Sequence, residues 1–182
     1  MISLPRGVNL DDLLKFLRNI GLKSSFMLRN FERDLVPLYN STDNLHLNLN
    51  KKELVTEADL NLNKYILNEF KKSYPNTAWD IISEENAKLN SYEVSKCDWK
   101  WFIDPLDGTR DFLQNTGEFA VHLGLLFKNE PILSLVLLPR LKEMWFGVNE
   151  IGTWKESEEN ILKKEKVDFE NKKLKNSLEN KD

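Results

Sequence analysis

Two aspartates, Asp104 and Asp107, stand at the end of an apolar run within the segment 101–109, whose sequence is Trp-Phe-Ile-Asp-Pro-Leu-Asp-Gly-Thr. Pro105 and Gly108 turn the backbone beside them, because proline fixes φ and glycine tolerates positive φ. Carboxylates at a rigid turn can bind divalent cations, and exposed backbone N–H groups at the same turn can bind a phosphate. This segment is therefore the first candidate for a catalytic centre.

Further carboxylates stand at the ends of other expected elements. Asp59 lies at the expected start of a helix, and Glu84 and Glu85 follow a short apolar strand. Carboxylates that converge in space repel one another unless a cation lies between them. Hard oxygen ligands select Mg²⁺, Mn²⁺ or Ca²⁺ rather than zinc or copper, and the spacing of the two histidines, His46 and His122, does not indicate a zinc site.

Each acidic segment also has a simpler interpretation. Asp107 followed by Gly108 is an ordinary turn signal. The pair Glu84 and Glu85 is typical of the first turn of a helix, where acids oppose the helix dipole. His122, inside an apolar strand, is typical of a hydrogen-bonded core or edge residue. The order and joint presence of the acidic segments favour a metal site over these local explanations.

The step from Gly108 to Thr109 suggests how such a site would act. If a helix begins at Thr109 or Arg110, its first N–H groups are unpaired and attract phosphate. Metal ions beside it would neutralise the phosphate charge and lower the pKa of a bound water, which becomes the nucleophile. Thr109 could orient that water, and Asp59 could accept its proton.

The bulk composition limits the class of protein. The 182 residues are 41% hydrophobic and 30% charged, which is typical of a globular protein. A net charge of -3 argues against binding to a nucleic-acid polymer. No apolar run is long enough to span a membrane, and no secretory signal is evident. The single cysteine, Cys97, fits a reducing compartment, so a cytoplasmic location is expected.

The periodicity of apolar residues predicts an α/β (α+β) fold. In chain order we expect a helix over 11–29, a loop over 40–52, an extended piece over 54–56, a helix over 59–74, a strand over 79–82, a capped turn or short helix over 83–90, a strand over 100–103, an antiparallel meander over 119–127, 132–138 and 143–148, and one more strand from 152. The two long helices would cover one face of a mostly antiparallel sheet.

The composition changes after Trp154. Residues 155–182 are mostly charged or polar and contain neither glycine nor proline. Such a segment buries little apolar surface. The sequence therefore predicts a domain over 1–154 and a charged tail over 155–182, either helical or disordered.

Three motifs, taken together, resemble the inositol monophosphatase superfamily. They are Val55-Thr56-Glu57-Ala58-Asp59, then Ile82-Ser83-Glu84-Glu85, then Trp101-Phe102-Ile103-Asp104-Pro105-Leu106-Asp107-Gly108-Thr109. The resemblance covers roughly residues 10–154. It implies a layered sugar-phosphatase-type fold and a Mg²⁺-dependent, lithium-sensitive phosphatase that acts on a small phosphorylated substrate.

The residues after the third motif bear on the branch of the superfamily. The sequence Thr109-Arg110-Asp111-Phe112 is similar to the Thr-Lys-Glu-Phe of 3′(2′),5′-bisphosphate nucleotidases, which convert adenosine 3′,5′-bisphosphate to AMP and phosphate in sulfur assimilation. Inositol monophosphatases tend to have Thr-Thr-Asn-Phe there. Histidinol-phosphate phosphatases can also carry arginine at this position, so both remain alternatives.

The resemblance also implies roles for individual residues. The expected Mg²⁺ ligands are Glu84, Asp104, the carbonyl of Leu106, and Asp107, with Asp104 bridging two ions. The expected catalytic residues are Asp59, Thr109 and Glu84. The backbone of Gly108 and Thr109 would contact the phosphate, and Glu85 is a further candidate.

The chain departs from the superfamily in its carboxy-terminal part. Members continue into a second half whose Trp-Asp-x-x-Ala-Gly motif completes the second metal site, and Trp154 is here followed by Lys155. The sequence therefore resembles an amino-terminal half. A truncated, inactive half-enzyme that only binds metal is an alternative, and a homodimer or a separate second half are the candidate partners.

Overall fold

The computed structural model describes the backbone of residues 4–39, 44–89 and 97–163, and the side chains of these residues outside 36–56 and 88–89. Its elements are α1 (Leu10–Tyr39), α2 (Asn44–Ser73), β1 (Asp80–Ser83), α3 (Glu84–Leu89), β2 (Trp99–Asp107), α4 (Thr109–Gln114), β3 (Ala120–Phe127), β4 (Glu130–Leu138), β5 (Glu143–Val148), β6 (Gly152–Ser157) and α5 (Glu158–Leu162). Among the described residues, none of the helices combines the length and the apolar character that crossing a membrane requires.

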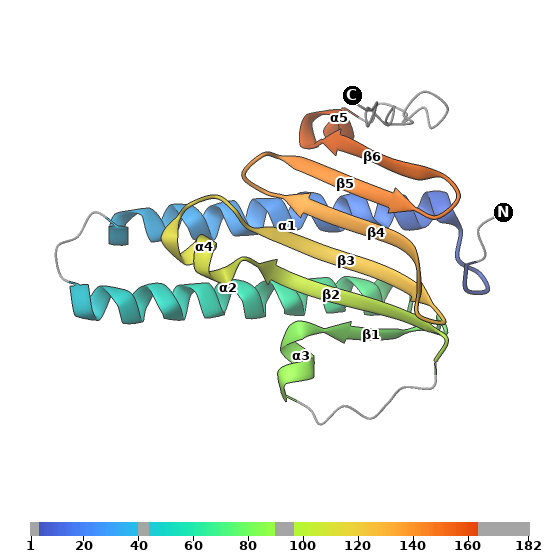
Figure 1. Ribbon diagram of the computed structural model, residues 1–182, viewed down its shortest axis with the longest axis horizontal. Coiled ribbons are helices and arrows are strands. Elements are labelled where there is room, and N and C mark those ends of the chain that lie inside the picture. Colours follow the sequence, from blue (N-terminus) through green and yellow to red (C-terminus); the bar gives the residue numbers. More distant parts are fainter. Residues whose placement is uncertain (1–3, 40–43, 90–96, 164–182) are drawn as a thin grey trace, which may run out of the picture.

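The six strands form one sheet in the order β1-β2-β3-β4-β5-β6 (Figure 1). Strands β1 and β2 are parallel, and every later pair is antiparallel. The meander predicted from three segments rich in β-branched and aromatic residues is confirmed as β3, β4 and β5, and the further strand expected from residue 152 is β6. The expectation of a mostly antiparallel sheet in an α/β fold is confirmed.

Helices α1 and α2 lie side by side across one face of this sheet, α1 against β4 and α2 against β2 (Figure 1). Their apolar faces meet the inward side chains of the strands, and the largest of these side chains, including Phe70 and Trp101, are fully buried. Phe16, Phe70 and Trp101 form edge-to-face contacts that join α1, α2 and β2, with ring centroids 4.9 and 5.0 Å apart. This aromatic packing fixes the positions of α2 and β2, which carry candidate site residues.

Both long helices extend further than the sequence indicated. Helix α1 continues to Tyr39 and α2 begins at Asn44, so the predictions of a loop over 40–52 and an extended piece at 54–56 are wrong from residue 44 onward. The chain has no glycine or proline between Pro37 and Pro75. Asparagine is a weak helix former but not a breaker, and tertiary packing outweighs its low propensity.

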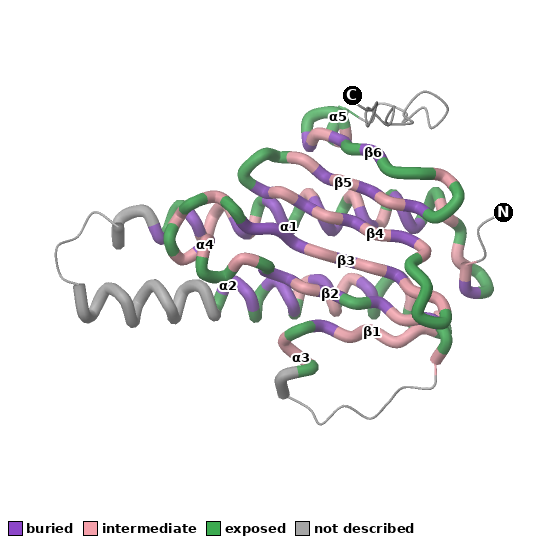
Figure 2. The backbone as a smooth tube through the Cα atoms, in the orientation of Figure 1, coloured by how far each residue is buried: buried purple, intermediate pink, exposed green. Residues whose placement is uncertain are grey.

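The opposite face of the sheet carries no helix in the part of the chain that the structure describes (Figure 1). Buried and partly exposed residues alternate along β2, β3 and β4, as expected when only one face packs on a core (Figure 2). Phe102 of β2 lies on the helix-free face and is 44% exposed.

The described fold continues past Trp154. Strand β6 runs to Ser157, and two acids beyond Trp154 pair with α1: Arg18 contacts both carboxylate oxygens of Glu156 at 2.8 and 2.9 Å, and Arg29 contacts those of Glu158 at 2.7 and 3.0 Å. These two ion pairs connect β6 and the start of α5 to α1. Residues 164–182 of the expected tail lie outside the described residues, and the division into domain and tail stays a prediction.

Candidate active site

A β-bulge places the two aspartates of the central motif on the same side of the sheet. In a regular strand, residues three apart point to opposite faces. Strand β2 is irregular here, because Asp104 pairs with His122 whereas Asp107 pairs with Ala120, so three steps along β2 oppose two steps along β3. The extra residue restores the parity and turns both carboxylates to one face.

Glu84 is brought to Asp104 by the parallel pairing of β1 and β2. Ser83 is opposite Ile103 in the register, so the next residue of each strand, Glu84 and Asp104, emerges at the same edge. Buried Ser83 accepts a hydrogen bond from the backbone N–H of Asn86 at 3.2 Å and so caps α3. The cap fixes Glu84 and Glu85 in the first turn of this helix, as the sequence predicted.

The Glu84 and Asp104 carboxylates are in direct contact. Burial, the negative charge of Glu84 and a side-chain hydrogen bond with Glu84 raise the pKa of Asp104 to about 6, although the backbone N–H of Leu106 donates to its Oδ1 at 3.1 Å. Two carboxyl groups that share a hydrogen bond hold a proton between them, and a divalent cation can replace that proton.

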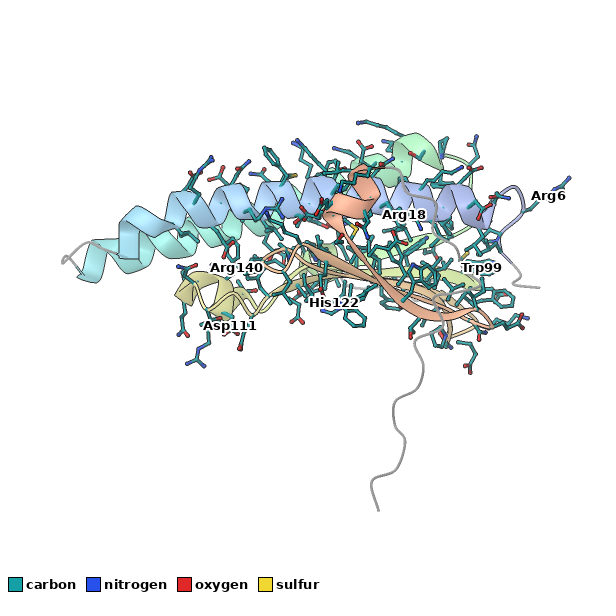
Figure 3. The ribbon with its side chains drawn as sticks, turned by 90° about the horizontal axis from the view of Figure 1, so that it is seen from above. Arg6, Arg18, Trp99, Asp111, His122 and Arg140 are labelled. Atoms are coloured by element: carbon teal, nitrogen blue, oxygen red, sulfur yellow. The ribbon has the colours of Figure 1, made fainter. Side chains whose placement is uncertain are left out.

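Asp107 points to a different partner. Its Oδ2 atom lies 3.1 Å from Nε2 of His122 on the adjacent strand. Nε2 donates this hydrogen bond, since a carboxylate oxygen accepts. Figure 3 views the sheet close to edge-on and shows His122 on the side away from α1. The structure therefore groups the acids of this region into two pairs, Glu84 with Asp104 and Asp107 with His122.

The turn after the bulge matches its sequence. Gly108 has φ of +82° and caps α4, and an added Cβ would lie 2.7 Å from the backbone oxygen of Glu118, so only glycine fits. Thr109 begins α4, as predicted, and its hydroxyl donates to the carbonyl oxygen of Leu106 at 3.1 Å. The carbonyl expected to bind metal and the hydroxyl expected to orient water are thus adjacent.

Asp59 lies in the interior of α2 rather than at the helix start that the sequence indicated, and it is 8% exposed. One helical turn later, Asn63 is also buried and donates to Oδ1 of Asn86 in α3 at 3.3 Å. Residues four apart share a helix face. Asp59 is therefore on the face of α2 that looks toward α3, the helix that carries Glu84, and α2 also contacts β2 and α4.

The described residues contain no group of three or more histidine, cysteine, aspartate or glutamate side chains that could hold a metal ion. What they provide is one carboxylate pair with a backbone carbonyl close by in sequence, and these are the hard oxygen donors that Mg²⁺ prefers. The Glu84 and Asp104 carboxylates repel each other when both are ionised, and a cation between them would relieve that repulsion. The donor set fits one cation at this pair.

The carboxylate pair lies at the margin of a hollow of about 580 Å³ on the helix-free face of the sheet. Glu84, Asp104 and His122 line the hollow together with apolar residues such as Phe102 and Val136. The sequence indicated a hydrogen-bonded core or edge residue at His122, with no role in the site. The alternation along β3 could have placed it on the outer face, but its position opposite Asp104 depends on the strand register, which local sequence does not specify.

Comparison with protein families shows that the model of the inositol monophosphatase family matches residues 10–181. The 3′(2′),5′-bisphosphate nucleotidase CysQ of Haemophilus influenzae is 37% identical over 111 residues, which is 60% of this chain and 40% of that protein. The fructose-1,6-bisphosphatase/inositol-1-monophosphatase of Aquifex aeolicus is 31% identical over 104 residues, 57% of this chain and 37% of that protein.

Among solved structures, inositol monophosphatase II of Staphylococcus aureus has the same fold, with a TM-score of 0.62 at 21% sequence identity. The match covers 79% of this chain and 49% of the Staphylococcus aureus chain. The chain thus spans about two fifths of the length of these curated relatives and about half of the solved enzyme.

Proposed function

Because this chain belongs to the inositol monophosphatase family, we propose that it acts as a Mg²⁺-dependent phosphomonoester hydrolase of the 3′(2′),5′-bisphosphate nucleotidase type. The proposed reaction converts adenosine 3′,5′-bisphosphate and water to AMP and inorganic phosphate. The nucleotidase from Haemophilus influenzae supports this substrate class, as does the sequence Thr-Arg-Asp-Phe over 109–112. The observation that carries the proposal is the Glu84–Asp104 pair, two carboxylates that the parallel pairing of β1 and β2 brings into contact.

In the proposed site, Glu84 and Asp104 hold the first cation with the Leu106 carbonyl, and Asp107 extends the anionic surface along the same face of the sheet. When bound, Mg²⁺ supplies positive charge that stabilises the phosphoryl group and acidifies water. The rigid bulge and the capped start of α3 hold the two carboxylates in place before the substrate arrives, which favours catalysis by positioning.

The turn between β2 and α4 would serve the phosphate and the water. The backbone N–H groups of Gly108 and Thr109, at the start of α4, would donate hydrogen bonds to a phosphate oxygen. The Thr109 hydroxyl donates its proton to the Leu106 carbonyl, so its oxygen can accept a hydrogen bond from the attacking water. Asp59, buried on α2, is the proposed acceptor of the water's proton, and Glu85 remains a further candidate.

The test is phosphate release by the purified chain with Mg²⁺, measured in parallel on adenosine 3′,5′-bisphosphate, an inositol monophosphate and histidinol phosphate. We expect release from the bisphosphate nucleotide, inhibition by lithium, and loss of release in Asp104→Asn and Glu84→Gln. Cys97→Ser is the control that should leave release unchanged. Faster release from either of the other substrates would replace the nucleotidase assignment with the corresponding phosphatase.

A second candidate function is cation binding without turnover. It is favoured by the length of the match, since the chain spans 40% of the Haemophilus influenzae nucleotidase, and by the lack of a three-carboxylate cluster among the described residues. Here Mg²⁺ would raise the melting temperature through Glu84 and Asp104, but none of the three substrates would release phosphate. Both candidate functions therefore predict that Mg²⁺ binds at Glu84 and Asp104, and only the first predicts that phosphate is released.

A further inference from the structure

We propose that His122 is a positioning residue that orients the Asp107 carboxylate toward a divalent cation. The proposal rests on the cation site proposed above and goes beyond it, because His122 belongs to none of the three sequence motifs. It gives a role in the site to a histidine that the sequence indicated only as a hydrogen-bonded core or edge residue.

The geometry places His122 between the two aspartates. It is opposite Asp104 in the register of β2 and β3, and its Nε2 lies 3.1 Å from Oδ2 of Asp107. The bulge in β2 is what turns Asp107 back toward His122. His122 is thus the cross-strand neighbour of Asp104 and the hydrogen-bond partner of Asp107.

Asp107 needs such a partner more than Asp104 does. The Asp104 carboxylate is held by Glu84 and by the N–H of Leu106. The Asp107 side chain is 60% exposed at the end of its strand, where water allows several rotamers. The hydrogen bond from Nε2 selects one rotamer and engages only Oδ2, which leaves Oδ1 available to a cation.

This hydrogen bond also fixes the histidine. Donation from Nε2 requires a proton on that atom, and this fixes the orientation of the ring toward Asp107. A carboxylate that accepts a hydrogen bond from a neighbouring group is the usual arrangement around protein-bound metals, and removing the neighbour typically lowers metal affinity about 10- to 100-fold. The same replacement has little effect on folding, because both side chains are partly exposed, His122 by 41% and Asp107 by 60%.

The experiment measures Mn²⁺ binding to the full chain without substrate, by electron paramagnetic resonance of the free ion. His122→Ala removes the donor, whereas His122→Gln keeps an N–H group at nearly the same reach. Ser134→Ala is the matched control, since Ser134 lines the same hollow on β4 and carries no charge. Urea unfolding of each variant separates binding from stability.

We expect His122→Ala to weaken Mn²⁺ binding about 10- to 100-fold with nearly unchanged stability, and His122→Gln to stay within about threefold of the wild type. Equal binding by His122→Ala and the wild type would overturn the proposal, as would equal losses in the alanine and glutamine variants. A wild-type chain that does not bind Mn²⁺ overturns it too. Because no substrate is present, a chain that binds Mn²⁺ as expected but releases no phosphate would refute the proposed function and leave this role of His122 intact.

Discussion

Replacing Asp104 by asparagine should stabilise the metal-free protein at neutral pH while it removes the response to a cation. Asp104 has a pKa of about 6 against an ordinary 3.8. Such a shift corresponds to about 3 kcal/mol for an isolated group, and solvent screening at this half-buried position lowers that to about 1–2 kcal/mol. Asparagine carries no charge, and its amide can donate to Glu84 in place of the shared proton.

The pH dependence has a definite sign. The folded state binds the Asp104 proton more tightly than the unfolded state does, so the carboxylate costs no stability below about pH 4 and the full amount above about pH 6. The free energy of unfolding of the wild type should therefore fall relative to Asp104→Asn as pH rises through this window. Titrating groups that do not interact with Asp104 cancel in the difference between the two proteins.

Urea unfolding at several pH values, with and without Mg²⁺, tests this reasoning. Without the ion, Asp104→Asn should be more stable than the wild type at pH 7 by about 1–2 kcal/mol. With Mg²⁺ at one hundred times its dissociation constant, the wild type should gain about 2.7 kcal/mol and the variant nothing. Asp98→Asn removes an exposed charge just before β2 and is the control. A metal-free variant less stable than the wild type at pH 7, or a retained response to Mg²⁺, would refute the reasoning.

Three further predictions concern the framework of the site, each checked by urea unfolding. Gly108→Ala should lower the free energy of unfolding by about 1–3 kcal/mol more than Gly7→Ala does. Both glycines have positive φ, but only at Gly108 would a Cβ meet a backbone oxygen, at 2.7 Å. Equal losses of stability in the two variants would contradict the close contact. Arg18→Met and Glu156→Met should each lower the free energy of unfolding by about 3–5 kcal/mol, because each leaves one buried charge unpaired. The double variant should lose less stability than either single variant. A double variant whose loss equals the sum of the two single losses would argue against a buried ion pair. Leu17→Ala, at a fully buried position in α1, should cost about 2–5 kcal/mol, and a cost below 1 kcal/mol would contradict its place in the core.

The sequence predicted the elements whose pattern is local. Strands β3, β4 and β5 are rich in apolar residues and are bounded by turn residues, and Ser83 followed by two acids carries its own capping signal. The prediction for residues 44–56 was wrong because their polar, asparagine-rich composition is typical of a loop, although the segment contains no residue that stops a helix. Helix α2 continues through it to the packed segment beyond.

The features that the sequence did not predict depend on contacts between distant parts of the chain. Two aspartates three residues apart share a face only because β2 bulges against β3, and the position of His122 beside them follows from the same register. Glu156 and Glu158 belong to a segment whose composition looks solvated, yet each is buried against an arginine of α1. Charge composition alone does not reveal such long-range partners.

The most direct test of the central claim is anomalous diffraction from crystals of the chain grown or soaked with Mn²⁺. We predict an anomalous peak within coordination distance of both the Glu84 and the Asp104 carboxylates, which should disappear in Asp104→Asn. Crystals with Mn²⁺ bound elsewhere on the protein, and without a peak at the Glu84–Asp104 pair, would contradict the account.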